Sequence, residues 1–162
     1  MNNWLTQLNG KSVDKIYQIG FDNNYEDIFL PALFFITFKD LNKFLEIDGD
    51  FEGNQIRINL INNSEFDQKL KENDLSTESD SWKVSNCSPE ETLGKLLGQK
   101  IDFVEYGIGK EEFKKGVFEF ITFICKNLEL TIFETSTTGL YVTENPKVKL
   151  NFEKKINIYS TK

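Results

Sequence analysis

Short stretches in which apolar and polar residues alternate recur along the whole chain, and β-branched and aromatic side chains fill most of them. A two-residue period is typical of strands, because successive side chains of a strand point to opposite faces of a sheet. Glycine-containing turns at 48–49, 52–53 and 138–139 suit hairpins between neighbouring stretches. Connections this short favour antiparallel pairing. We expect strands at Val13–Gly20, Ala32–Phe38, Phe44–Ile47, Asn54–Leu60, Ile101–Tyr106, Gly116–Ile124, Leu128–Glu134, Leu140–Thr143 and Lys155–Tyr159.

Helix signals mark three short segments. In the clearest, Ser88 can cap a helix that has Pro89 at its first position and Glu91 completing a capping box, and Gly98 should end it. The other two expected helices are Trp4–Leu8, capped by Asn2 or Asn3 and followed by Gly10, and Ser64–Lys71, capped by Ser64. The expected fold class is therefore α+β, a mainly antiparallel and twisted sheet with two or three short helices on one face or edge.

The two halves of the chain resemble each other, which indicates a degenerate internal duplication. One constant offset relates Leu8, Gly10, Val13, Asp14 and Ile16 to Leu96, Gly98, Ile101, Asp102 and Val104. The sequence Phe-Ile-Thr-Phe occurs at 35–38 and again at 120–123, and strand-like segments follow each copy in the same order. We expect a single domain over residues 1–162, built from two αββββ units at about 2–62 and 88–145. The polar stretch 72–86, acidic at its centre, should link them as a loop.

Several kinds of catalytic and metal site are excluded by composition. The chain has no histidine, and Cys87 and Cys125 show no paired spacing. A Ser-His-Asp triad, a Cys-His pair and a His-ligated metal are thereby ruled out, and both cysteines are interpreted as free structural thiols. Residues 48–54 imitate the first half of an EF-hand loop, but the later ligand positions fail. Asp14 and Asp102 could form a carboxylate pair, yet alternation points both toward solvent. We expect no enzymatic activity, no cofactor and no metal.

The charge balance, 26 acidic against 19 basic residues, bears on partners. A net charge of −7 repels phosphate backbones and anionic membrane surfaces, so we expect neither nucleic acid nor a membrane as partner. It favours a basic protein, although solubility alone is the alternative reason for such a charge. Residues 1–11 lack the features of a signal peptide, and the longest apolar run, Phe29–Ile36, contains Pro31 and is too short to span a bilayer. We expect a cytoplasmic protein.

Three acidic segments are candidates for a protein-binding face, because carboxylates can guide a basic partner and an aromatic side chain can anchor it. Solvated loops are the alternative interpretation. The candidate partner-binding residues are Asp22, Tyr25, Glu26 and Asp27 in the first segment, Asp48, Asp50 and Glu52 in the second, and Asp74, Glu78, Asp80 and Trp82 in the third.

In size, acidity and composition the whole chain resembles the immunity proteins that bacteria encode beside polymorphic toxins, and the acidic turns FDNNYED (21–27) and DGDFEG (48–53) are the closest local features. The resemblance implies tight one-to-one binding to a cognate toxin domain, often a basic nuclease, by blocking its active site or an adjacent surface. Carboxylates would then pair with the lysines and arginines that the toxin uses for phosphates. The alternatives are a structural or accessory homodimeric domain without catalytic activity and, less favoured, a small carboxylate enzyme.

Overall fold

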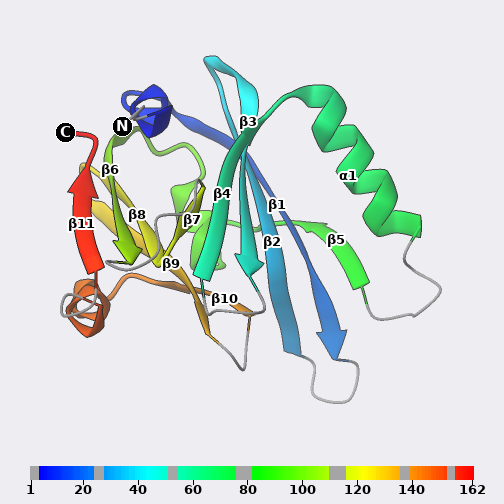
Figure 1. The fold of residues 1–162 in the computed structure, drawn as a ribbon. Helices are drawn as coiled ribbons and strands as arrows, with labels where there is room; N and C mark the ends of the chain where they lie inside the picture. The colour runs from blue at the N-terminus through cyan, green and yellow to red at the C-terminus, as the bar shows by residue number, and fades with distance from the viewer. Residues whose placement is uncertain are drawn as a thin grey trace.

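A computed structural model describes residues 4–23, 28–50, 55–75, 82–109, 116–135, 139–152 and 156–162. Within them the chain forms two antiparallel sheets that share a core, with an α-helix on the outside of the first (Figure 1). The expected α+β class with mainly antiparallel strands is confirmed. The elements in chain order, with η for a 3-10 helix, are η1 (Trp4–Leu8), β1 (Val13–Asn23), β2 (Ile28–Phe38), β3 (Leu41–Asp50), β4 (Gln55–Ile61), α1 (Asn63–Leu75), β5 (Trp82–Asn86), η2 (Leu93–Leu96), β6 (Ile101–Gly109), β7 (Val117–Phe118), β8 (Phe120–Cys125), β9 (Leu128–Thr135), β10 (Gly139–Thr143), η3 (Pro146–Asn151) and β11 (Ile156–Ser160).

Each sheet contains a run of four strands joined in chain order, β1-β2-β3-β4 in the first and β6-β8-β9-β10 in the second. The first sheet also has β5 beside β1 and the short β7 beside β4, and the second has β11 beside β6. The single strand expected over Gly116–Ile124 is divided. Phe118 pairs with Ile56 in the first sheet, whereas Phe120 pairs with Gly107 in the second. Apolar residues continue through this segment, but the backbone changes its hydrogen-bonding partner and so passes from one sheet to the other.

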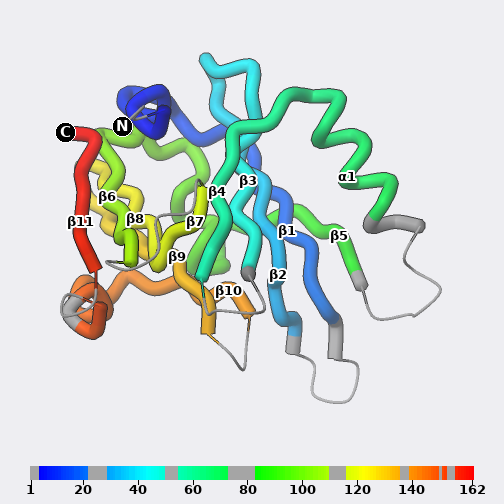
Figure 2. Tube along the Cα trace, viewed as in Figure 1, coloured from blue at the N-terminus to red at the C-terminus, as the bar shows by residue number. Residues whose placement is uncertain are grey.

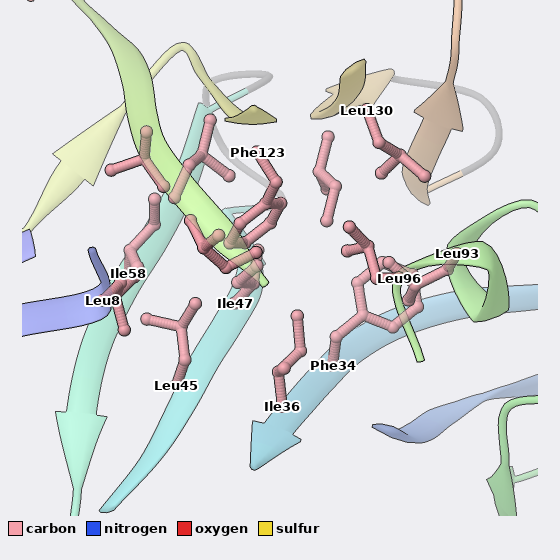
Figure 3. Packing of buried hydrophobic residues seen from close by; sticks show 14 of the residues in the cluster. Leu8, Phe34, Ile36, Leu45, Ile47, Ile58, Leu93, Leu96, Phe123 and Leu130 are labelled. Carbon is pink, nitrogen blue, oxygen red and sulfur yellow. The ribbon is translucent and has the colours of Figure 1, made fainter. Parts of the chain in front are cut away.

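The main core lies between the two sheets (Figure 3). It is made by the inward faces of both four-strand runs, and the 3-10 helices η1 and η2 cover its margin. Figure 3 labels Phe34, Ile36, Leu45, Ile47 and Ile58 from the first sheet, Phe123 and Leu130 from the second, and Leu8, Leu93 and Leu96 from η1 and η2. Because full burial of one large apolar side chain is worth about 1.5–3 kcal/mol, this shared core holds the two sheets together as one unit.

The segments that open the two halves meet beside this core, and their hydrogen bonds repeat each other. Gly10 N donates to Ile101 O (2.7 Å), and Gly98 N donates to Val13 O (3.0 Å). Both glycines have φ of 75°, a conformation that glycine adopts without strain. The pattern continues in Val13 N to Gln99 O (2.9 Å), Ile101 N to Lys11 O (2.8 Å) and an antiparallel bridge between Ser12 and Lys100. An approximate two-fold axis therefore relates the two segments.

The helix α1 covers the outer face of the first sheet through Phe66. The ring of Phe66 stacks on Phe44, with centroids 4.0 Å apart, and meets Phe35 edge-on at 5.0 Å. Ile19 and Ile61 complete this second apolar cluster. The first sheet is thus covered on both faces at this position, as the apolar character of β2 requires.

Two predictions about the first half need correction. Asn62 caps α1 instead of Ser64, because Asn62 Oδ1 accepts a hydrogen bond from Glu65 N (2.9 Å) and Glu65 Oε2 accepts one from Asn62 N (2.8 Å). Both ends of the loop expected over 72–86 are regular structure instead, since residues 72–75 finish α1 and residues 82–86 form β5. An edge strand needs only backbone pairing with its neighbour, so five mostly polar residues suffice.

The helix expected after Ser88 is a turn followed by the 3-10 helix η2. The capping contact is present, since Glu91 Oε2 accepts a hydrogen bond from Ser88 N at 2.6 Å. The backbone then returns so close to its start that a Cβ on Gly94 would lie 1.7 Å from Ser88 O. Gly94 therefore allows a tight turn where the capping motif alone predicts a regular helix.

Candidate functional site

The three acidic segments join the described strands at one end of the first sheet. β1 and β3 both pair antiparallel with β2, so they run in the same direction and finish at the same end, at Asn23 and Asp50 (Figure 2). β5 pairs antiparallel with β1, and Trp82 lies opposite Phe21, so β5 begins at that end. We call this end of the sheet, marked by Asn23, Asp50 and Trp82, the acidic end.

Asp48 is the candidate whose surroundings are best described. It is half-buried in β3 and lies opposite Arg57, the only arginine of the chain, in the β3–β4 ladder. Opposite charges on directly facing strand positions attract, so Asp48 has a basic neighbour within its own chain. Only the backbone is described for Asp22, Asp50, Asp74 and Trp82, at or near the ends of β1, β3, α1 and the start of β5. Tyr25, Glu26, Asp27, Glu52, Glu78 and Asp80 lie outside the described residues.

A pocket of about 230 Å³ opens between the two sheets, close to the acidic end. Phe29, which lies directly opposite Asp22 in the β1–β2 ladder, forms part of its wall. The remaining wall comes from residues of β1 and β2, the 87–93 turn and β10: Gln18, Phe34, Cys87, Glu91, Leu140 and Tyr141 are among them. This site has no signal in the sequence, because its walls come from three distant segments and Glu91 shows only a helix-capping pattern.

Glu91 is the charged group of this pocket. Its Oε1 accepts a hydrogen bond from Gln18 Nε2 (2.8 Å), and its Oε2 accepts the one from Ser88 N. Burial alone would raise the pKa of Glu91, but the hydrogen bonds from Gln18 and Ser88 outweigh it and keep the pKa below its usual value. The carboxylate is therefore ionised at neutral pH, and Gln18, itself buried, holds it in place.

Cys87 lies in the same wall and is a buried free thiol, as predicted, and so is Cys125 in β8. Burial, followed by the charge of Glu91, raises the pKa of the Cys87 thiol to about 12. Burial also raises the pKa of Cys125, to about 11. Because the thiolate is the reactive form, neither group is a nucleophile at neutral pH.

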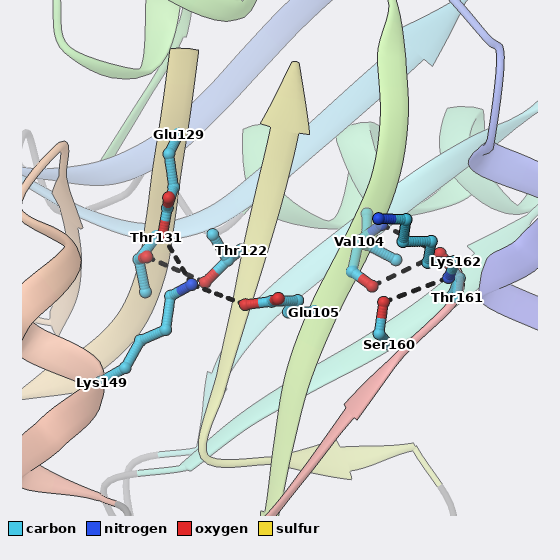
Figure 4. Close-up of polar contacts among 9 residues, drawn as sticks. All are labelled: Val104, Glu105, Thr122, Glu129, Thr131, Lys149, Ser160, Thr161 and Lys162. Carbon is cyan, nitrogen blue, oxygen red and sulfur yellow. Dashed lines mark hydrogen bonds and ion pairs between the residues drawn. The ribbon is translucent and has the colours of Figure 1, made fainter. Parts of the chain in front are cut away.

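A second polar cluster lies on the outer face of the second sheet (Figure 4). Lys149 Nζ, from η3, lies 2.6 Å from Glu105 Oε2 and 2.6 Å from Glu129 Oε1. Beside them Thr122 and Thr131 share a hydroxyl–hydroxyl hydrogen bond of 2.9 Å. Burial alone would lower the pKa of Lys149, but its contacts with both carboxylates outweigh burial and raise that pKa. Every charge in this cluster has a partner, so its role is to hold η3 against the sheet.

Within the described ranges, no group of histidine, cysteine, aspartate and glutamate side chains could hold a metal ion. Asp14 and Asp102 are exposed, as alternation predicts. None of the helices in the described residues is both long enough and apolar enough to cross a membrane. No family model, curated protein or solved structure matches this chain.

Proposed function

We propose that this chain is an immunity protein that binds a cognate bacterial toxin domain and neutralises it. The acidic end would cover a basic active site or the surface beside it. The observation that carries the proposal is the convergence of the three acidic segments on one end of one sheet. These segments, at 21–27, 48–54 and 74–82, contain nine of the 26 acidic residues and no lysine or arginine.

Electrostatics supports this assignment of the face. Charges of one sign that are gathered at one end produce a local field, which speeds encounter with a basic surface and orients it. Large side chains nearby can supply the anchor that charge alone does not. Phe21 in β1 and Val84 in β5, whose strands start or end here, are 40% and 38% exposed. An apolar centre with a charged surround is typical of protein-binding surfaces.

The chain supports a second proposal, that it arose by duplication of one αββββ unit. The symmetric hydrogen bonds between Gly10 and Ile101 and between Gly98 and Val13 support it, as does the equal strand order of the two four-strand runs. The first hairpin turns are also alike, Lys-Asp at 39–40 and Lys-Asn at 126–127. Strand pairing makes Phe38 equivalent to Cys125, because these residues pair with Val13 and Ile101. The two Phe-Ile-Thr-Phe copies are therefore two residues out of step.

The alternative function, a structural homodimer, has one observation in its favour. In the described chain β11 is an edge strand, and its Ile158 and Tyr159 are 40% and 37% exposed. An exposed edge with apolar side chains can pair with a second copy. The test of the immunity proposal must therefore also report the oligomeric state.

The test is binding of the purified protein to the toxin domain encoded by the adjacent gene, with complex mass from light scattering and Kd from calorimetry. We expect a 1:1 complex, weakened about 10–100-fold by Asp50→Lys with Glu52→Lys, because charged contacts contribute strongly to such interfaces. Asp14→Lys with Asp102→Lys changes the net charge equally at exposed sites away from the acidic end. This control should change Kd by less than about threefold, as surface charges remote from an interface do. Equal weakening by both pairs, or a self-dimer that ignores the toxin, would refute the proposal.

A further inference from the structure

The pocket beside the acidic end has the size for one side chain and not for a cofactor. Its volume is about 230 Å³, whereas pockets for drug-sized ligands span about 300–1,000 Å³. It is open at the junction between the two sheets, next to the position where β1 and β2 reach the acidic end. A protein docked on that end would lie directly against its mouth.

The described lining of the pocket combines apolar side chains with the uncharged polar groups of Gln18 and Thr92, and Glu91 is its one charged residue. Phe29, Phe34 and Leu140 supply an apolar lining, while Glu91 supplies a carboxylate. None of the described lining residues is a lysine or arginine, and within the described chain Glu91 forms no ion pair. A carboxylate beside apolar side chains and without a cation is the complement of a cation on an apolar stem.

Glu91 is also held ready for such a ligand. Gln18 and Ser88 each donate one hydrogen bond, one to each carboxylate oxygen, which fixes the orientation of the group. The side chains of Cys87 and Ser88 also hydrogen-bond to this carboxylate, but Glu91 is solvent-exposed and so stays accessible to a ligand cation.

The geometry points to this pocket as the receptor for a single arginine side chain of the partner, with the guanidinium on Glu91 and the alkyl stem against the apolar wall at Phe29. The inference rests on the proposed function for the identity of the partner. Arginine suits the site better than lysine, since its planar group can donate several hydrogen bonds to one carboxylate, whereas the lysine ammonium is a point charge. A covalent ligand is not implied, because Cys87 is a neutral thiol.

The first experiment addresses the pocket without any partner. The wild-type protein is titrated with butylguanidinium or with N-butylurea, which has the same shape and no charge, and amide shifts are followed by NMR. We expect butylguanidinium to move the side-chain amide of Gln18 and the backbone amides of 140–142, and butylurea to move them at least about tenfold less at equal concentration, as a charge-assisted contact requires. Equal shifts with both compounds, or none with either, would overturn the inference.

The second experiment uses the toxin complex and three variants. Glu91→Gln removes the charge and keeps an oxygen that can accept from Ser88, and Thr92→Phe fills the exposed rim of the pocket without altering Glu91. Each should raise Kd about tenfold or more, the usual effect of losing a charged hydrogen bond. Glu90→Gln removes the same charge from an exposed neighbour that does not line the pocket, and should change Kd less than about twofold.

The outcomes separate the two proposals. If wild-type protein binds the toxin and Glu91→Gln and Thr92→Phe bind it equally well, the arginine pocket is refuted and the immunity function stands. If no toxin complex forms, the immunity function is refuted, while the butylguanidinium titration still decides whether the pocket takes an alkyl cation. Unfolding midpoints of the variants, compared with wild type, show whether a loss of binding reflects a loss of fold.

Discussion

A helical segment covers the outer face of each sheet, and each segment contacts its sheet through one phenylalanine and one lysine. The two sheets differ in which of these contacts is more extensive. On the first sheet α1 contributes Phe66 and Lys69, three residues apart on one helix face. On the second sheet the cover is η3, which contributes Lys149, together with Phe152, the residue directly after η3. These two residues are also three apart, which places them on one side of a 3-10 turn. Each cover therefore presents one aromatic ring and one ammonium group to the sheet below.

The difference lies in the strand residues that these covers meet. The pairing rows correspond, Tyr17–Phe35–Glu46 on the first sheet and Glu105–Thr122–Thr131 on the second. Where the first row places an aromatic ring at its centre, the second places a hydroxyl. Phe66 is accordingly buried among three rings, and the ammonium group of Lys69 contacts the buried carboxylate of Glu46. Phe152 is only half-buried, and Lys149 meets two carboxylates. One architecture thus tolerates either an apolar or an ionic attachment of its cover.

Removal of the aromatic ring of the cover should give the largest difference in stability between the two sheets. Phe66→Ala leaves a cavity among Tyr17, Phe35 and Phe44, so we expect the free energy of unfolding to fall by about 3–4 kcal/mol. Urea denaturation with an unchanged slope provides the measurement.

Phe152→Ala is the matched control on the other sheet. The centroid of its ring lies 5.5 Å from that of Phe120 and 5.8 Å from that of Phe133, but Phe152 is half-exposed. We therefore expect the free energy of unfolding to fall by about 1–2 kcal/mol. Equal losses for the two variants would mean that the second cover depends on its aromatic contact as much as the first does, and that the contrast drawn from Lys149 is wrong.

Removal of the ammonium group should destabilise the second sheet, whose cover is attached mainly through Lys149. Lys149→Met leaves Glu105 and Glu129 without their shared cation, and we expect a loss of about 2 kcal/mol, moderated by the partial exposure of both carboxylates. The additional changes Glu105→Gln and Glu129→Gln should restore at least half of it, because the orphaned charges are then gone.

The pH dependence of this cluster has a defined direction. The pKa of Lys149 is raised above its ordinary 10.5 in the folded chain. Its contribution is therefore fully present below that value and is lost as pH rises through the higher, folded pKa. The stability difference between wild type and Lys149→Met should be constant from neutral pH to about 10 and shrink above it. A difference that persists unchanged at pH 12 would contradict the ionic attachment.

Most of the sheet was predictable from the sequence because each strand carries its own evidence. Alternation in 13–20 or 128–134 reports burial on one face, and burial on one face is what keeps these strands in place. β5 was missed since an edge strand is held by backbone pairing with β1, which leaves little mark on the side chains of 82–86. The change of sheet at Glu119 has no signal in the sequence either, because a continuous apolar segment does not show which backbone is its partner.

The same distinction, between features that a local segment encodes and features that only packing creates, applies to the candidate site. The acidic segments are visible as sequence, and the strand pairing adds that they share one end of a sheet. The pocket has no local signal, because Gln18, Glu91 and Leu140 are brought together only by the packing of two sheets. The capping motif at Ser88 and Glu91 was recognised, but its second use, as a fixed carboxylate in a pocket wall, depends on Gln18 from another strand.

The smallest expected effect tests whether the polar row of the second sheet could be converted to the apolar kind. Thr122→Val keeps the volume but leaves the Thr131 hydroxyl buried without its partner, so we expect a loss of about 1 kcal/mol. Thr122→Val with Thr131→Val removes both hydroxyls, and the loss should then fall below about 0.5 kcal/mol, because two apolar groups of the same shape replace a satisfied pair. Urea denaturation of wild type, Thr122→Val, Thr131→Val and the double variant gives four free energies of unfolding. Their deviation from additivity measures the interaction energy of the two hydroxyls. An additive result would show that the two hydroxyls act independently. The second sheet would then need each threonine for its own reason, and its polar row could not be replaced by an apolar one like that of the first sheet.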